Sequence, residues 1–375
     1  MSGVRRALHA LLAEAEARID GFRGAVRRAG GRASELDIHL YGGHGNERRT
    51  VLRGRVLEAR PLRPAGPDDS ALRNLARAIA RLDSTEVGGA RIRLVSGGAS
   101  AEVESDDEGY FEATLTTPTG SGLWRRVEAS VLAAPAPFRA GARASGQYQV
   151  PAPGVAAGII SDLDDTVLRT EATSLLRMAR HTFFGNAHTR QAFPGVGALY
   201  RGLRGDAESL SRPFFYVSSS PWNLFDLLVR FLELNHIPRG TLLLKDYGLT
   251  SDHLIAADHT KHKLAHVLAI LDAHPGLRFV LMGDSGQHDA DVYAAAVRER
   301  PGRVRAVCIR RVARQRDGLD RSLADIAAGG AAAVAGADTL ALARGLAEAE
   351  LISAGVVEAV EREMKRDLDD IGPSS

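Results

Sequence analysis

The sequence predicts an α/β fold in which an open parallel sheet follows an N-terminal all-β sandwich, with helices at both ends of the chain. Short alternating or β-rich runs fill the first part, and continuous apolar runs separated by helical stretches begin near residue 156. A length of 375 residues suits two or three domains. We therefore divide the chain into an amphipathic helix (1–34), a β-sandwich domain (35–150), an α/β domain (151–315) and a C-terminal helical segment (316–375).

The N-terminal segment places apolar side chains at helical spacing between residues 4 and 28, with arginines among them. This pattern predicts an amphipathic helix. Seven arginines against three acidic residues in 1–34 suit an anionic membrane surface; the alternative is a helix packed on the rest of the protein. Residues 345–375 have a similar spacing and an acidic excess, so the two ends of the chain can pair with each other.

The next region contains six short runs with the alternation or composition of β-strands. They are 36–41, 50–59, 90–96, 101–105, 110–117 and 124–133. The acidic, glycine-ended stretch 106–109 predicts a hairpin loop, and a helix is expected near 71–83. Strands at such near-regular spacing are typical of a small sandwich, and no catalytic constellation stands out among them.

Five continuous apolar runs then predict strands that are buried on both faces, as in a parallel sheet covered by helices. They are 156–161, 213–218, 241–245, 278–283 and 304–310. Ligands of such sheets bind beyond the carboxyl ends of the strands, and polar residues directly follow the first four runs. The chemistry is therefore expected at these ends.

The composition excludes several classes of protein. Hydrophobic residues make up 45% and charged residues 25%, as in ordinary soluble globular proteins. The single cysteine, Cys308, excludes a disulfide framework and multi-cysteine metal sites. Forty-eight basic residues against 46 acidic ones do not indicate a nucleic-acid partner. Because no signal peptide or membrane-spanning segment is visible, we expect a cytoplasmic location, with peripheral membrane contact through 1–34 as an extension.

The first candidate site is D-x-D-x-T, formed by Asp162, Asp164 and Thr166 directly after the first buried run. Alternate residues of an extended segment face the same way, so both carboxylates can point into one site. Two close carboxylates repel unless a cation or proton lies between them, and Mg²⁺ prefers oxygen ligands. The alternative is a turn or helix N-cap; a calcium loop fails because a strand precedes it and no glycine follows.

A second acidic pair, Asp284 and Asp289, follows the fourth run and can complete the coordination of the same cation. The stretch 283–286 reads GDSG, as in serine proteases of the trypsin type. That interpretation fails because Gln287 stands where those enzymes have glycine and because the surroundings are α/β.

Hydroxyl and ammonium groups follow the second and third runs. Ser218, with Ser219 and Ser220 behind it, precedes a predicted helix start, where backbone N–H groups favour an anion; simple N-capping is the alternative. Only four of the 48 basic residues are lysines, and three of the four are Lys245, Lys261 and Lys263. A lysine cluster suits a single phosphoryl oxygen, or else lies on a solvated helix face.

His262 and His266 flank Lys263 at a spacing that can bind zinc. The H-E-x-x-H pattern of zinc enzymes is absent, so surface or packing histidines are expected.

The four motifs, in this order, resemble those of the haloacid dehalogenase-like phosphohydrolases, a group with a Rossmann-like sheet. The stretches 161–167, 214–224, 261–271 and 274–293 are similar to the catalytic domain of phosphatidate phosphatases of the fungal actin-patch type, relatives of the lipins. The resemblance covers about 156–312. It implies that 151–315 is a phosphatase domain with Mg²⁺ as cofactor and a phospholipid or other phosphomonoester as substrate.

The resemblance also implies roles for individual residues. Asp162 is the nucleophile that forms an aspartyl-phosphate, and Asp164 is the acid and then the base. Thr166 fixes the loop, Ser218 holds a phosphoryl oxygen with Ser219 as second choice, and Lys263, rather than Lys261, neutralises phosphoryl charge and orients Asp162.

For the metal, the resemblance implies ligation by Asp162, Asp284 and the Asp164 carbonyl. Asp289 belongs to the same group, in a supporting position.

Three functions stay open on the sequence alone. The first is Mg²⁺-dependent hydrolysis of phosphatidate to diacylglycerol. The second keeps the chemistry but acts on a soluble phosphomonoester or phosphoprotein. The third is a catalytically idle module that binds lipid or protein, disfavoured because all the catalytic residue types are present. No particular protein partner is predicted.

Overall fold

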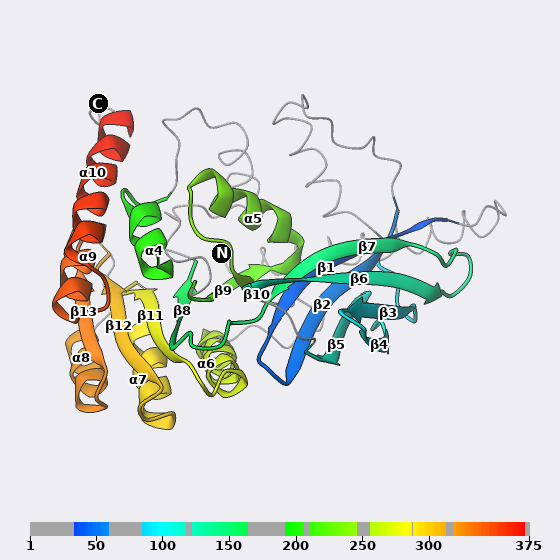
Figure 1. Cartoon of the computed structure of the whole chain (residues 1–375), viewed down its shortest axis with the longest axis horizontal. Coiled ribbons are helices and arrows are strands. Elements are labelled where there is room, and N and C mark those ends of the chain that lie inside the picture. Colours follow the sequence, from blue (N-terminus) through cyan, green and yellow to red (C-terminus); the bar gives the residue numbers. More distant parts are fainter. Residues whose placement is uncertain are drawn as a thin grey trace, which may run out of the picture.

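The computed structural model describes residues 34–59, 85–117, 122–163, 192–205, 211–245, 256–286, 288–312 and 318–371. These residues form a seven-stranded sheet and a six-stranded sheet, which lie next to each other along the long axis of the molecule (Figure 1). The expected helices within 1–34 and 71–83 lie outside the described residues. The expected pairing of the two chain ends is therefore not tested, because residues 1–33 are not described.

The N-terminal sheet confirms the β-rich region. Its strands are β1 (Leu36–Gly45), β2 (Arg49–Glu58), β3 (Arg91–Ser96), β4 (Ala99–Glu104), β5 (Tyr110–Thr116), β6 (Trp124–Ala133) and β7 (Arg143–Gln149). All but β7 correspond to expected runs. The β7 sequence RASGQYQ is polar with a central glycine, and it becomes a strand through its antiparallel pairing with β6.

The pairing of these strands differs from the predicted sandwich. They form one continuous sheet in the order β4-β3-β6-β7-β1-β2-β5, and the edge strands β4 and β5 contact each other, so the sheet curls around a single apolar core. The 106–109 stretch is a turn but does not close a hairpin, because β4 pairs with β3 and β5 with β2. The hairpin joins β3 to β4 through Gly97 and Gly98, whose φ angles of 54° and 89° favour glycine.

The second sheet confirms the open parallel arrangement. Its strands are β8 (Ala157–Asp162), β9 (Phe214–Pro221), β10 (Thr241–Lys245), β11 (Arg278–Asp284), β12 (Val304–Arg310) and β13 (Ala332–Gly336). The order is β10-β9-β8-β11-β12-β13, and every neighbouring pair is parallel. Strand β13 was expected to be helical. Its small residues carry little strand signal, and pairing with β12 makes it the sixth strand.

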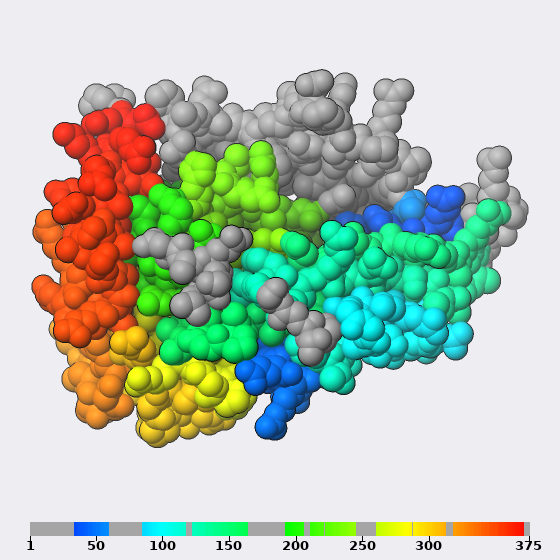
Figure 2. Space-filling model, viewed as in Figure 1, coloured from blue at the N-terminus to red at the C-terminus, as the bar shows by residue number. Residues whose placement is uncertain are grey.

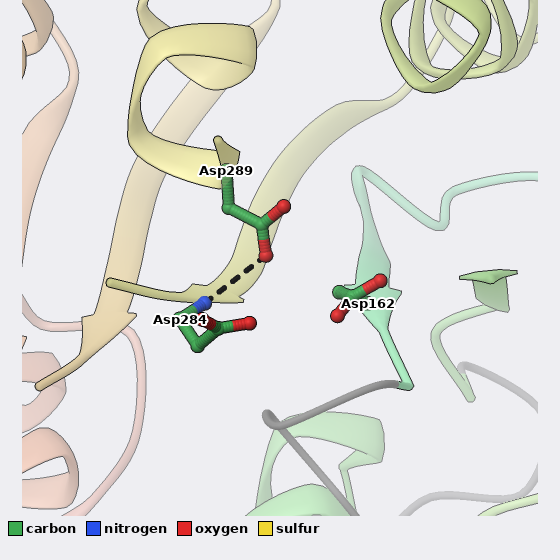
Figure 3. Close-up of side chains that lie close together, drawn as sticks. All are labelled: Asp162, Asp284 and Asp289. Atoms are coloured by element: carbon green, nitrogen blue, oxygen red, sulfur yellow. Dashed lines mark hydrogen bonds between the residues drawn. The ribbon is translucent and has the colours of Figure 1, made fainter. Parts of the chain in front are cut away.

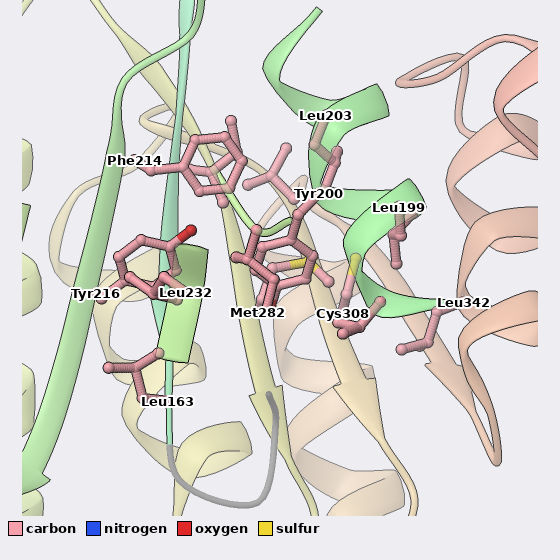
Figure 4. Packing of buried hydrophobic residues seen from close by; sticks show 14 of the residues in the cluster. Leu163, Leu199, Tyr200, Leu203, Phe214, Tyr216, Leu232, Met282, Cys308 and Leu342 are labelled. Atoms are coloured by element: carbon pink, nitrogen blue, oxygen red, sulfur yellow. The ribbon is translucent and has the colours of Figure 1, made fainter. Parts of the chain in front are cut away.

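Helices cover both faces of this sheet. They are α4 (Val196–Arg204), the short 3₁₀ helix η3 (Trp222–Leu224), α5 (Phe225–Leu234), α6 (Ala256–Ala273), α7 (Asp289–Glu299), α8 (Leu319–Ala328), α9 (Thr339–Glu348) and α10 (Ala354–Ile371). One apolar core contains α4, α5 and α9, and in it Leu199 and Tyr200 pack against Met282 and Cys308 (Figure 4). The other core contains α6, α7 and α8.

The C-terminal helix α10 packs on α4 and α9 and lies at the opposite end of the molecule from β3 and β4 (Figure 2). Glu363 of α10 accepts a hydrogen bond from the main-chain N–H of Ala198 at 2.6 Å and pairs with Arg201. None of the described helices is both long and apolar enough to cross a membrane.

Candidate active site

The candidate site lies where the chain changes direction in the parallel sheet. After β8 the chain adds β9 and β10 on one side, and then returns to place β11 on the other side of β8. Ligands of open α/β sheets bind at such a point, beyond the carboxyl ends of the strands. Asp162 is the last residue of β8 and Asp284 the last of β11, so both lie at this position.

Three carboxylates meet there. Asp162, Asp284 and Asp289 each offer an oxygen, and these oxygens lie within 4.8 Å of one another. Figure 3 shows the side chains arriving from β8, from β11 and from the first turn of α7. All three residues are buried, with at most 1% of their surface exposed. Buried carboxylates so close together repel each other strongly unless positive charge compensates them.

Lys263 of α6 supplies one positive charge to this cluster. Its Nζ atom lies 2.8 Å from Oδ1 of Asp162 and also donates a hydrogen bond to Oδ1 of Asp289. Burial by itself lowers the pKa of Lys263, but the carboxylates of Asp162 and Asp289 outweigh that effect and hold the pKa above its ordinary value. Lys263 is therefore an ammonium ion at neutral pH, whereas Lys261 on the same helix is exposed.

Asp289 holds the cluster together from the start of α7. Its Oδ1 accepts from Lys263, and its Oδ2 accepts from the main-chain N–H of Asp284 at 3.1 Å. A Cβ atom at Gly283 would lie 2.5 Å from Asp289 Oδ2, so only glycine lets the aspartate approach this closely. Both carboxylate oxygens of Asp289 are thus engaged in fixing its neighbours, while Asp284 accepts from Gly286 N–H at 2.6 Å through Oδ1.

Ser218 lies near the carboxyl end of β9, next to β8. Its neighbour Val217 pairs with Asp162, and Ser218 is buried while Ser219 is exposed. The Ser218 hydroxyl oxygen accepts a hydrogen bond from Ser220 N–H at 3.0 Å. Between the two candidates, burial next to β8 favours Ser218.

Two of the expected site residues, Asp164 and Thr166, lie outside the described residues, so their roles stay predictions. His262 and His266 form an edge-to-face ring pair with centroids 4.3 Å apart. Among the described residues, the three aspartates are the only group of three or more histidine, cysteine or acidic residues able to hold a metal ion.

The donor set fits a hard divalent cation. It consists of carboxylate oxygens, which Mg²⁺ prefers, and it contains no sulfur or nitrogen donor. Three carboxylates also leave excess negative charge after Lys263 has neutralised one of them, and a divalent cation compensates that excess.

Sequence reasoning missed the contribution of the β domain to this region. Tyr41 of β1 stacks on Trp222 with ring centroids 4.6 Å apart, and Arg55 of β2 donates a hydrogen bond to Asn223 at 2.8 Å. Both contacts hold the η3 turn that follows Ser218. Local patterns contain no signal for them, because the partners are more than 160 residues apart along the chain.

Comparison with known proteins identifies the segment of the chain that contains this site. Residues 157–311 match the family described as phosphatidate phosphatase APP1, catalytic domain. Phosphatidate phosphatase APP1 of Saccharomyces cerevisiae is 34% identical over 154 residues, which are 41% of this chain and 25% of that protein. An uncharacterized protein of Schizosaccharomyces pombe is 27% identical over 155 residues, again 41% and 25% of the two chains. The match thus spans about a quarter of the length of these relatives.

One solved structure aligns with this chain at low similarity. The CARDB domain of a Pyrococcus furiosus protein aligns with a TM-score of 0.18 and 12% identity, covering 32% of this chain and 89% of that one. The sequence match to known proteins is stronger. Residues 157–311, which hold Lys263, Ser218 and the three clustered aspartates, are similar to the catalytic domain of phosphatidate phosphatase APP1, as the resemblance of the motifs predicted.

Proposed function

We propose that this chain is a magnesium-dependent phosphatase that hydrolyses phosphatidate to diacylglycerol through an aspartyl-phosphate intermediate. The observation that carries the proposal is the contact of Lys263 with Asp162, at 2.8 Å, inside a buried cluster of three aspartates. This cluster lies within the segment that matches the phosphatase catalytic domain. The parallel sheet, with the nucleophile at the end of β8, supports a haloacid dehalogenase-like assignment as part of the same proposal.

In the first step, the Asp162 carboxylate attacks phosphorus. Lys263 contacts Oδ1, so we assign the attack to Oδ2. The bond from Oδ2 to phosphorus forms while the bond from phosphorus to the alcohol oxygen breaks, and the leaving alkoxide takes a proton from Asp164. Lys263 neutralises charge on the phosphoryl oxygens, and the Ser218 hydroxyl binds one of them.

In the second step, water attacks the phosphorus of the aspartyl-phosphate. Asp164, now a carboxylate, removes the water proton, the Oδ2 to phosphorus bond breaks, and inorganic phosphate leaves with Asp162 restored. Throughout, Asp289 keeps Lys263 and the main chain of Asp284 in place.

Asp162, Asp284 and the main-chain carbonyl of Asp164 would hold the magnesium ion. When bound, Mg²⁺ neutralises charge that builds up on the transferring phosphoryl group. A supporting position for Asp289 follows from the hydrogen bonds that occupy both of its oxygens.

Phosphate release from phosphatidate in mixed micelles tests the proposal, with and without Mg²⁺, on the wild type and on Asp162→Asn. We expect Mg²⁺-dependent release that the variant lacks. Turnover of soluble phosphomonoesters or a phosphoprotein without turnover of phosphatidate would reject the lipid substrate. The proposed phosphatase mechanism would remain. Turnover that survives in Asp162→Asn would reject the nucleophile. A phospholipid substrate also requires peripheral contact with a membrane, which we include in the proposal together with a cytoplasmic location.

A further inference from the structure

A cavity of about 510 Å³ lies between the β domain and the parallel sheet. Its size is that of an ordinary site for a small organic ligand, about 300–1,000 Å³. The β domain contributes aromatic side chains, of which Tyr41 and Tyr110 are the largest, and Arg53. The parallel sheet and its helices contribute Trp222, Leu244, His262 and His266.

Two of the residues that line this cavity lie close in sequence to residues of the candidate active site. Trp222 follows the β9 end that carries Ser218, and His262 directly precedes Lys263 on α6. Leu244 lies at the carboxyl end of β10, the neighbour of β9. The acidic cluster extends from β8 toward β11, on the other side. A phosphoryl group held at Asp162 therefore has the metal residues on one side and the cavity on the other.

The walls of the cavity are fixed by contacts between the two sheets. Arg55 is only 5% exposed and donates to Asn223, to the Glu108 carbonyl and to Glu86, while its guanidinium lies 4.1 Å from the centroid of the Tyr110 ring. Tyr41 stacks on Trp222. These contacts tie the aromatic side chains of the β domain to the turn after Ser218, so the cavity has a defined shape.

More contacts hold the rest of the interface. Gln149 donates to Thr241 Oγ1 at 2.7 Å, Asn46 donates to the Ala273 carbonyl at 2.7 Å, and the rings of His44 and His274 are joined by a hydrogen bond of 3.0 Å. The two sheets are therefore joined by polar and aromatic contacts at several points.

The charges around the cavity do not suit a second phosphate. Its described lining contains one arginine, Arg53, against the three acidic residues Glu104, Asp106 and Glu112. Arg53 is paired with Glu112 at 2.6 Å. An anion would meet excess negative charge here. The aromatic walls instead suit an uncharged organic group, provided that its polar atoms find hydrogen bonds.

His266 offers such a hydrogen bond. Burial, with smaller contributions from His262 and Arg53, lowers the pKa of His266 to about 4, so the ring is neutral at pH 7. Its Nε2 atom is buried and has no hydrogen-bond partner among the described residues. A buried polar atom of this kind is costly unless a ligand or water satisfies it.

We infer that this cavity binds the uncharged alcohol portion of the phosphomonoester, with Trp222 forming its aromatic wall and His266 contacting its ester or hydroxyl oxygens. For phosphatidate, that portion is the esterified glycerol. The inference rests on the proposed function and adds to it the part of the molecule that selects the alcohol. The β domain, outside the segment 157–311 that matches the family, then contributes most of the residues that line this part of the substrate site.

The first test compares two substrates in the full-length protein with Mg²⁺. His266→Trp fills the cavity, and His39→Trp makes the same change in the β domain outside it. The substrates are dioctanoyl phosphatidate and acetyl phosphate, whose leaving group is too small to reach the cavity. We expect His266→Trp to lower kcat/KM for the lipid at least tenfold, mainly through KM, and to leave acetyl phosphate within twofold. His39→Trp should change neither.

An equal loss for both substrates in His266→Trp would overturn the inference, since it would indicate general damage to the site. An unchanged kcat/KM for the lipid would overturn it as well.

The second test is independent of turnover. The chain has two tryptophans, so Trp124→Phe leaves Trp222 as the only indole. We expect monomeric dioctanoylglycerol to change the fluorescence of this variant saturably. The change should disappear when His266→Phe is added to Trp124→Phe, because phenylalanine removes the hydrogen-bonding ring nitrogens without adding a second indole. Absence of any change would overturn the inference even where phosphatidate is hydrolysed. A saturable change without hydrolysis would leave the cavity assignment in place and reject the proposed function.

Discussion

The Nζ atom of Lys263 lies 2.8 Å from Oδ1 of Asp162, and this contact joins α6 to the end of β8. The same ammonium group also contacts Asp289 at the start of α7. One lysine thus links three elements around the proposed nucleophile.

Lys263→Met should abolish most of the activity. The substitution keeps the length of the side chain but leaves Asp162 and Asp289 without their ammonium partner and the phosphoryl oxygens without its charge, so kcat should fall by about 10²-fold or more. The measurement is phosphate release at saturating Mg²⁺. Lys261→Met is the matched control, because this exposed lysine lies two positions away on the same helix, and its activity should stay within twofold of the wild type. Comparable losses in both variants would contradict the assignment.

Asp284→Asn and Asp289→Asn should differ in their response to Mg²⁺. If Asp284 is a ligand, its loss should raise the Mg²⁺ concentration for half-maximal activity about tenfold or more. Asp289 fixes Lys263 and the Asp284 main chain, so its loss should lower kcat with a smaller change in the Mg²⁺ requirement. Activity measured against Mg²⁺ concentration in both variants tests this difference. A larger change in the Mg²⁺ requirement for Asp289→Asn than for Asp284→Asn would mean that Asp289, and not Asp284, is the ligand.

Gly283→Ala should lower both activity and stability, because the added methyl group would collide with Asp289. The added methyl group would lie 2.5 Å from Asp289 Oδ2 and 2.8 Å from a ring carbon of Tyr293, so Asp289 must move away from Lys263. We expect a tenfold or greater loss of kcat and a destabilisation of about 1–3 kcal/mol. Gly276→Ala adds its methyl group to open space and should leave both quantities nearly unchanged. Urea unfolding and steady-state kinetics of the two variants provide the comparison.

The histidine pair His44 and His274 at the domain interface should make stability depend on pH. Burial, followed by the effects of His274, Arg53 and Arg49, lowers the pKa of His44 to about 3, and burial with Arg303 lowers that of His274 to about 4. In the unfolded chain both titrate near 6.5, so the unfolded state binds protons that the folded state does not. The free energy of unfolding should therefore be fully present above pH 6.5 and decrease below it, by up to about 1.4 kcal/mol per pH unit for each histidine.

Urea unfolding between pH 7 and pH 4.5 measures this dependence. His44→Gln should have a shallower slope than the wild type, whereas His39→Gln, on the same strand but outside the pair, should keep it. An unaltered slope in His44→Gln would show that His44 does not contribute to the dependence.

Much of the α/β domain could be read from local patterns. The runs 241–245 and 304–310 coincide with β10 and β12 because strands covered on both faces need apolar side chains at every position. The expected grouping of Asp162 with Asp284 rests on the same logic, since parallel strands end at one edge of the sheet. Residue type and position at a strand end were sufficient for that part.

Contacts between segments that are distant in the sequence decide the strand pairing, the exposure of the lysines and the cavity. The 106–109 stretch forms a turn, yet β4 and β5 pair with other strands, because turn residues specify a reversal of the chain and not its hydrogen-bonding partners. Strand β13 depends on its pairing with β12, and the packing of α6 leaves the Lys263 side chain 14% exposed while Lys261 is exposed to solvent. The cavity behind Trp222 joins side chains from β1 to α6, and its shape is a property of the assembled fold because no local stretch of chain contains both walls.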